Sequence, residues 1–389
     1  MTTPADYTSV DWSYPTSIRF GPGRLAELPK ACEVAGIASP LLVTDQGLRD
    51  LEITQRARDL LPTAGFFSEI KANPVDANVE AGVLAFRHGR HDGVVAFGGG
   101  SALDVGKCIA FMAGQTRPIW DFEDIGDDWK RADATAIAPI VAVPTTAGTG
   151  SEVGRAGVII NTATKTKKVI FHPKMLPAVV ISDPELTLGV PPEITAGTGM
   201  DALAHCLEAY FAPTFHPMSE GIAVEGARLV KKALPRAVAD GSDLEARAML
   251  MAAASMGAVA FQKGLGAIHA VSHPVGALYD TPHGLTNAVF MPYVLAFNAA
   301  AIETKAARLA AWLGLAEQSL AGLIDWVSGL RDAIGIPHTL VGLGVRDDSK
   351  FEAMAAMAVV DPTAGGNPLP LDVEGALHIY RAAAEGRVG

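Results

Sequence analysis

The sequence changes its pattern at Asp183-Pro184, and this change constrains the fold more than any other feature. Before it, short runs rich in Val, Ile, Leu and Phe alternate with longer runs at helical spacing. After it, the strand-like runs stop, and Ala, Leu, Met and Glu recur at helical spacing nearly to the end. We therefore predict two domains: an α/β domain over residues 1–184 and an all-helical domain over residues 185–389.

The first part contains four apolar runs of strand length, with amphipathic stretches between the first three. These runs are 41–44, 65–68, 94–97 and 140–143. Such alternation is typical of a parallel sheet that helices cover on both faces. Three further runs, at 157–160, 168–171 and 179–182, are predicted to extend the same sheet.

Composition narrows the class of protein. Of the 389 residues, 49% are hydrophobic and 19% charged, which indicates a well-buried globular enzyme and excludes a disordered chain. The net charge of −11 argues against nucleic acid or an anionic membrane as the partner. The longest apolar run, 248–261, is too short to span a bilayer. Three scattered cysteines and the lack of a signal-peptide pattern predict a cytoplasmic protein.

Three histidines, His269, His273 and His283, fall within fifteen positions. If residues 267–277 form a helix, the first two share a face, because they are four residues apart. Pro282 and Gly284 flank His283 and indicate a turn that folds it back toward that face.

Asp201 and His205 repeat the four-residue spacing on a second predicted helix. A lone histidine on an apolar helix is more often a core or capping residue than a ligand. One carboxylate and up to three imidazoles, however, would suit a divalent transition metal with a coordination position left open.

A glycine-rich turn follows the predicted strand 94–97. Gly98, Gly99 and Gly100 precede Ser101 and an amphipathic helix that runs to about residue 112. Glycines there let backbone N–H groups approach a pyrophosphate at a helix N-terminus. The alternative is an ordinary tight turn, in which Ser101 and Asp104 cap the helix as an S-x-x-D box. No G-x-G-x-x-G fingerprint occurs.

Other residues could complete a cofactor site. The small residues of Pro144–Glu152 leave the strand 140–143 at the edge of the sheet where such folds bind ligands. Asp45 ends the strand 41–44 and could accept hydrogen bonds from ribose hydroxyls, unless it is only a solvated loop carboxylate. Lys167, in a run of lysines, could neutralise phosphate or simply face solvent.

Taken in order, four motifs resemble the iron-containing, group III alcohol dehydrogenases. They are residues 98–107 (GGGSALDVGK), residues 144–152 (PTTAGTGSE), Asp201-x3-His205 and His269-x3-His273-x9-His283. The resemblance covers nearly the whole chain, from about Phe20 to Pro368. It implies a dehydroquinate synthase-like fold, with an N-terminal dinucleotide-binding domain and a C-terminal helical domain that binds metal and substrate.

The resemblance also implies roles for particular residues. The metal ligands would be Asp201, His205, His269 and His283, and His273 would stand beside the metal without ligating it and relay the proton in catalysis. The residues contacting NAD would be Asp45, Gly98, Gly99, Gly100, Ser101, Asp104, Thr145, Thr146, Thr149 and Lys167. Because all four ligand positions are filled, the metal-free maleylacetate reductases are a poorer match.

The implied reaction moves a hydride between NAD(H) and an alcohol/aldehyde pair, with Fe²⁺, or alternatively Zn²⁺, as the metal and a homodimer as the assembly. Glycerol dehydrogenase-like and dehydroquinate synthase-like enzymes remain alternatives on the same scaffold, as does a non-enzymatic metal-storing protein.

Lys263 stands near the metal motif, where the segment 261–266 is one residue shorter than in many relatives. We consider two roles for it. It either attracts an acidic group on the substrate, or it is an exposed lysine that caps a helix.

Overall fold

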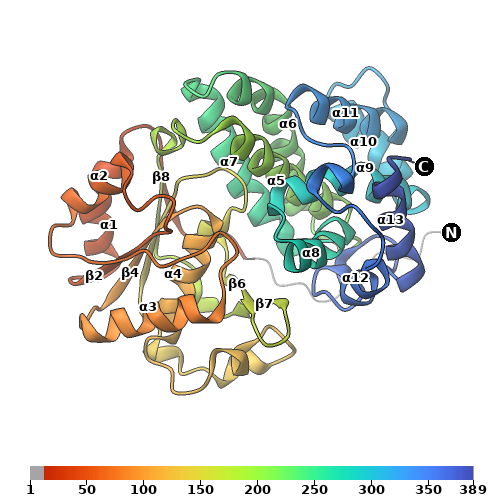
Figure 1. Cartoon of the computed structure of the whole chain (residues 1–389). Coiled ribbons are helices and arrows are strands. Elements are labelled where there is room, and N and C mark those ends of the chain that lie inside the picture. Colours follow the sequence, from red (N-terminus) through yellow and green to blue (C-terminus); the bar gives the residue numbers. More distant parts are fainter. Residues whose placement is uncertain (1–12, 389) are drawn as a thin grey trace. The chain divides into compact units, whose positions relative to one another are not determined.

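The computed structural model describes residues 13–388 and divides into two compact units (Figure 1). Tyr14–Gly189 forms one unit, and the described chain from Val190 onward forms the other. Strands are described only in the first unit, whereas the described residues of the second are helical or irregular. The predicted architecture, a parallel α/β domain followed by a helical region, is therefore confirmed.

The first unit is built on a six-stranded sheet in which every paired strand is parallel. Its order is β1-β8-β5-β4-β2-β3. The strands are β1 (Ser17–Phe20), β2 (Pro40–Val43), β3 (Gly65–Phe67), β4 (Gly93–Gly98), β5 (Ile140–Pro144) and β8 (Val179–Ser182). Parallel neighbours need crossover connections, and helices supply most of them here.

Alternate strand residues pack against helices on opposite faces of this sheet. Leu41, Val94 and Ile140 face a core shared with α3 (Asp76–His88) and α4 (Gly100–Met112). Leu42 and Val95 face a second core, shared with α1 (Leu28–Val34) and α2 (Glu52–Leu60). All five of these strand residues are buried, which explains why the strands read as continuous apolar runs.

Two of the runs predicted to extend the sheet do not do so. β6 (Ala156–Asn161) and β7 (Thr166–Phe171) pair with each other as a separate antiparallel hairpin. The connection 162–165 is far too short for the crossover that parallel strands need, and Lys165 at φ 54° completes its turn. The third run joins the sheet as predicted, and the short strand β1 was missed.

The second unit contains nine of the described α-helices. These are α5 (Pro192–Phe211), α6 (Pro217–Ala239), α7 (Leu244–Ala260), α8 (Ala267–Tyr279), α9 (His283–Phe297), α10 (Ala299–Trp312), α11 (Leu320–Ala333), α12 (Phe351–Ala358) and α13 (Val373–Glu385). α5, α6 and α7 pack against one another along their lengths, as Figure 1 shows in green.

Helix α7 is apolar and mostly buried, although the stripe with Ala248, Ala252 and Met256 is only partly buried. No residue from Ala246 to Ala260 is exposed. Together with the turn that follows, 244–263 has the length and mean hydropathy, 1.3, of a membrane span. Its buried Arg247, however, donates to Thr195 Oγ1 at 2.6 Å and to the Val190 carbonyl at 3.1 Å. These contacts identify α7 as a core helix of this unit.

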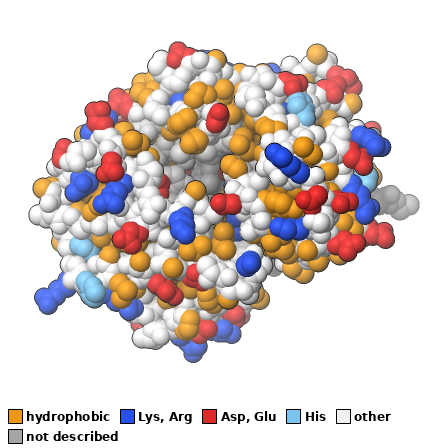
Figure 2. All heavy atoms as spheres, in the orientation of Figure 1, with side chains coloured by type: hydrophobic (Ala, Val, Ile, Leu, Met, Phe, Trp, Pro, Cys, Tyr) orange, Lys and Arg blue, Asp and Glu red, His pale blue; other side chains and the backbone are white. Residues whose placement is uncertain are grey.

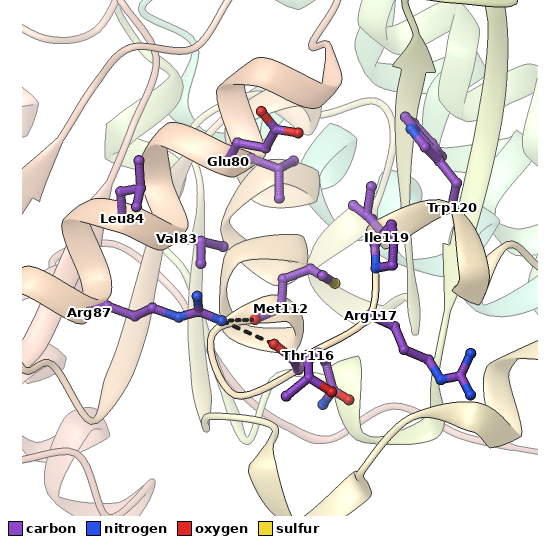
Figure 3. Close-up of a pocket in the computed structure, with 12 residues that line it drawn as sticks. Glu80, Val83, Leu84, Arg87, Met112, Thr116, Arg117, Ile119 and Trp120 are labelled. Carbon is purple, nitrogen blue, oxygen red and sulfur yellow. Dashed lines mark hydrogen bonds between the residues drawn. The ribbon is translucent and has the colours of Figure 1, made fainter.

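A groove of about 430 Å³ lies on the first unit between α3 and the segment that follows α4. Figure 3 shows Arg87 reaching from α3 toward Met112, where it donates to main-chain carbonyls at the C-terminal end of α4. The guanidinium thus caps a helix. Because α4 rises about 1.5 Å per residue, this end lies about 18 Å from the glycine turn, so the groove is separate from the candidate cofactor site.

Charged side chains of both signs are intermixed on the surface. On the face drawn in Figure 2, lysines and arginines are interspersed with aspartates and glutamates. That face therefore presents no extended basic band of the kind that steers a polyanion.

Lys263 holds the C-terminal end of α5. Its Nζ donates to the carbonyls of Ala209, Tyr210 and Ala212 at 3.0, 3.0 and 2.6 Å, and lies 2.9 Å from Glu220. The side chain is fully buried, and burial, reinforced by the nearby charge of Lys305, lowers its pKa to about 8. The hypothesis that Lys263 attracts a substrate acid is wrong, because its amine is already surrounded by acceptors inside the helical unit.

Replacing this lysine should destabilise the helical unit. Lys263→Met keeps the apolar stem but leaves the carbonyls of Ala209 and Ala212 without their lysine donor, while that of Tyr210 keeps Lys305 at 2.9 Å. Glu220 still keeps Lys305, 2.7 Å away, so we expect a loss near the low end for a broken buried pair, about 3 kcal/mol, in urea unfolding. The control Lys305→Met, whose side chain is 30% exposed and donates to only one of these carbonyls, should lose about 1 kcal/mol or less. Equal losses would contradict the capping role.

Candidate functional site

Helix α5 carries the first two predicted ligands on one buried face. Asp201 and His205 are four residues apart and are 3% and 5% exposed. The start of α9 packs directly on this helix, since a Cβ at Gly284 would lie 2.2 Å from the carbonyl oxygen of Gly197. Only glycine permits this approach, which brings the neighbouring His283 to Asp201.

The turn predicted around His283 is placed differently in the structure. His283 is the first residue of α9, and Gly284 lies inside that helix, so the two residues that flank His283 do not bracket a turn. The chain reverses instead after α8, at Asp280, whose φ is 55°. The N-terminal position still directs the imidazole of His283 toward Asp201, with 3.6 Å between Nε2 and Oδ1.

Helix α8 brings His269 to the same point. Ligand atoms of Asp201, His205 and His269 all lie within 4.8 Å of one another. The rings of His205 and His269 are stacked, with centroids 4.8 Å apart and an interplanar angle of 12°. The Nδ2 atom of Asn287 lies 2.8 Å from Asp201 Oδ1 and 3.2 Å from the Nε2 atoms of both His269 and His283. These three atoms therefore face a common position.

His273 stands at the edge of this cluster. Its ring stacks on His283, with centroids 5.4 Å apart. Its Nδ1 lies 2.8 Å from Asp361 Oδ2, and Oδ1 of the same carboxylate accepts from the backbone and hydroxyl of Thr363. His273 and Thr363 outweigh the effect of burial and lower the pKa of Asp361. The Nδ1 atom is thus committed to Asp361, and Nε2 is the atom left for proton exchange.

The cluster is accessible from one side. The side chains of Asp201 and His269 are 4% and 3% exposed, whereas those of His283 and His273 are 27% and 14% exposed. Within the helical unit, a small molecule would reach the cluster past the latter two.

The charges at the site compensate one another. Burial opposes ionisation of His269, but Glu208 and Asp201 outweigh it and raise its pKa to about 10. Burial likewise disfavours the Asp201 carboxylate, yet the three imidazoles of His205, His283 and His269 hold its pKa well below the usual range. In the metal-free state, a proton on His269 therefore supplies positive charge between two buried carboxylates.

The donor set fits a divalent metal. One carboxylate oxygen and imidazole nitrogens are ligands that Fe²⁺ and Zn²⁺ both accept. The buried ligands are held by further polar side chains, as is usual around metal sites.

Three residues that hold the site's histidines or Asp201 in place, Glu208, Asn287 and Asp361, were missed in the sequence analysis. Glu208 contacts His269 and carried a signal, because it lies three residues after His205 and seven after Asp201 on the same face of α5. Asn287 lies one turn after His283 and could have been found the same way. Asp361 is 88 residues from His273, and no local pattern links them.

The candidate cofactor site lies in the first unit, at the glycine turn between β4 and α4. A Cβ at Gly100 would meet the side chain of Thr149 at 2.5 Å, and one at Gly99 would meet Thr146 Oγ1 at 3.2 Å. Gly98, at φ 146°, lies next to Asp45, whose Oδ2 is 3.4 Å from its Cβ position. The structure thus brings Asp45, Gly98, Gly99, Gly100, Thr146 and Thr149 together.

Thr145 also belongs to this edge of the sheet. It follows β5, and its N–H donates to the carbonyl of Gly98 at 3.0 Å. Its buried hydroxyl has no hydrogen-bond partner among the described residues. An orphaned hydroxyl next to the glycine turn fits a site that a polar ligand or ordered water completes. Lys167 lies on β7, opposite Ile160 of β6.

The predicted S-x-x-D capping box is wrong. Helix α4 has Gly99 as its N-cap and no side-chain cap. Ser101 instead donates to the carbonyl of Ala72. Asp104 accepts from Ser151 Oγ at 2.5 Å and from the N–H of Val158 at 3.0 Å. Asp104 thus ties α4 to the loop after β5 and to the hairpin.

Comparisons with known proteins agree with this geometry. The family model described as iron-containing alcohol dehydrogenase matches residues 15–184, and that of the C-terminal part of the Fe-containing alcohol dehydrogenase family matches residues 195–384. A 4-hydroxybutyrate dehydrogenase of Cupriavidus necator is 40% identical over 91% of this chain and 94% of its own length.

Solved structures of similar sequence share the fold. A crystal structure of 1,3-propanediol oxidoreductase is 36% identical, with a TM-score of 0.92, and covers 97% of this chain and all of its own. Sulfoacetaldehyde reductase from Bifidobacterium kashiwanohense, solved in complex with NAD⁺, is 30% identical, with a TM-score of 0.88, and covers 97% and 99%. The resemblance read from the four motifs is confirmed: this chain belongs to the iron-containing alcohol dehydrogenase family.

Proposed function

We propose that this family enzyme uses a single divalent metal, held by Asp201, His205, His269 and His283, to interconvert a small alcohol and its aldehyde with NAD(H). The observation that carries this proposal is the meeting of one buried carboxylate and two buried imidazoles within 4.8 Å. His283, on the accessible side, would complete the ligand set. We take Fe²⁺ as the metal, with Zn²⁺ as the alternative, because these donors accept both.

Each group in the proposed site has a separate role in the reaction. When bound, the metal supplies a Lewis acid for the substrate oxygen, and NAD supplies the hydride acceptor. His273, fixed through Nδ1 by Asp361, takes up the alcohol proton at Nε2, directly or through water. Asp45, Gly98, Gly99, Gly100, Thr145, Thr146 and Thr149 hold the cofactor. Ser101 and Asp104, which also bind other parts of the protein, are further candidates for contacts with it, and Lys167 is a candidate for a phosphate contact.

The assembly and location follow the same proposal. We expect a homodimer that acts in the cytoplasm on a small-molecule substrate. Names of the relatives supply the first substrates to test, 1,3-propanediol and 4-hydroxybutyrate, beside ethanol.

The proposed function is tested by separating metal loss from loss of rate. Protein reconstituted with Fe²⁺, and separately with Zn²⁺, should produce NADH with a member of this alcohol panel. Asp201→Ala should lose bound metal and turnover together. His273→Ala should keep its metal and lose roughly 10²- to 10⁴-fold in kcat, the usual worth of a general base, and Asp361→Asn should lose less.

Two results would contradict these roles. Metal-depleted His273→Ala protein would make that histidine a ligand. No net NADH across the whole panel would favour a dehydroquinate synthase-like lyase, which regenerates its cofactor.

Metal binding should depend on pH in a defined direction. Since the pKa of His269 in the metal-free protein is about 10, its Nε2 carries a proton at neutral pH. A metal must displace that proton, so affinity should rise with pH, by roughly tenfold per unit for one proton released. Zn²⁺ dissociation constants measured by chelator competition at pH 6, 7 and 8 would check this. Constants that do not change with pH would rule out the protonated state.

The choice of cofactor should depend on Asp45. Its Oδ1 accepts from the N–H groups of Gly47 and Leu48 at 2.8 and 3.1 Å, while Oδ2 faces Gly98. A carboxylate there would repel a 2′-phosphate, so we expect a preference for NAD over NADP. Asp45→Asn should reduce the ratio of kcat/KM values for NAD and NADP by roughly tenfold, as repulsion of about 1.4 kcal/mol is removed.

The control for this variant is Asp50→Asn, because that side chain is 93% exposed in the same loop. It should leave the ratio unchanged. An Asp45→Asn enzyme with wild-type discrimination would show that another residue sets the preference.

A further inference from the structure

The first turn of α8 is capped by side chains from other parts of the chain. Its own N-cap, Gly266, offers no side chain. Asn367 Oδ1 accepts from the N–H of Ala267 at 3.1 Å. Glu208 Oε1 accepts from the N–H groups of Ile268 and His269 at 2.7 and 3.2 Å. Three of the free donors at this helix end are therefore satisfied from a distance.

Glu208 also binds the imidazole ring of His269. Its second oxygen, Oε2, accepts a hydrogen bond from Nδ1 of His269. One carboxylate thus binds the main chain and the imidazole of the same residue. Its side chain is 6% exposed, so water competes little for these bonds.

We propose that Glu208 is a positioning residue that makes His269 a metal ligand through Nε2. This inference rests on the metal site proposed above and adds a residue that does not itself bind the ion. A carboxylate is an acceptor only, so it keeps the hydrogen on Nδ1 and leaves Nε2 to face Asp201, 3.7 Å away. Its charge also makes the ring a stronger donor to a cation.

An amide cannot replace this carboxylate. Protein donors face Glu208 on both sides: two main-chain N–H groups meet one oxygen and the ring N–H meets the other. In Glu208→Gln, the NH₂ group must face one of these sets. If it faces the ring, Nδ1 becomes an acceptor and the only hydrogen of the neutral ring stays on Nε2, where a metal displaces it far less readily than the second proton of an imidazolium. If it faces the main chain, the first turn of α8 loses its acceptor.

The test compares the metal affinity of matched variants. Zn²⁺ and Co²⁺ dissociation constants of full-length protein would be measured by chelator competition, without any assay of activity. Loss of such a supporting hydrogen bond typically costs roughly 10- to 100-fold in affinity, and we expect that loss in Glu208→Gln. Glu208→Asp keeps the charge and should bind with intermediate affinity. If Glu208→Asp binds metal more tightly than Glu208→Gln, the charge and the acceptor oxygens of residue 208 matter, and not only its packing.

Glu220→Gln is the matched control. Glu220 lies in the same helical unit and pairs with Lys263 and Lys305 at 2.9 and 2.7 Å. Neither partner belongs to the proposed ligand set. This variant should lower the melting temperature of the metal-free protein but keep the wild-type metal affinity.

The outcomes separate this inference from the proposed function. If the wild-type protein binds metal and Glu208→Gln binds it with the same affinity, only the role of Glu208 is overturned. An equal loss of affinity in Glu220→Gln would overturn it as well, since general loosening of the unit would then explain both variants. Wild-type protein that binds neither ion would overturn the metal site itself, and this inference with it.

Discussion

The candidate metal centre depends on a close contact between the backbones of helices α5 and α9. Helix α9 begins so close to α5 that a Cβ at Gly284 would lie 2.2 Å from the carbonyl oxygen of Gly197. Any larger residue at position 284 would push the two helices apart. Because His283 starts α9 and Asp201 lies one turn after Gly197, this separation would act directly on the distance between two proposed ligands. His283 can share a metal with Asp201 only while the two helices keep this spacing.

Around that contact, several buried polar groups have a partner from another segment. Asn287 Oδ1 accepts from the Ser272 hydroxyl, and its amide group donates to Asp201. Asn367 caps α8 at one end, and Asp361, six residues earlier, holds His273 further along the same helix. The segment 361–367 therefore fixes both the start of α8 and the residue proposed to move the proton. Such satisfied networks make a site rigid, whereas a partly satisfied one would destabilise the unit.

Sequence periodicity predicted the parts of this arrangement that lie on single elements. The pairs Asp201/His205 and His269/His273 could be read from spacing alone, because residues four apart share a helix face. The strands of the parallel sheet could be read from apolar runs, although the 162–165 connection, too short for a crossover, should have separated the hairpin. Contacts between distant segments could not be read this way. The Asp361–His273 pair has no local signature, and the burial of Lys263 depends on where α5 ends in space.

The site must also remain folded when no cation is present, and its charges explain how this happens. Asp201 and Glu208 are both buried, and two uncompensated carboxylates would be costly there. The Glu208 and Asp201 charges outweigh burial and raise the pKa of His269, so that a proton on this ring neutralises part of their charge. A metal would supply the same positive charge in the proton's place. If the proposed site binds a metal, the metal would therefore replace a positive charge that the ring already carries, and the charge between the carboxylates would change little.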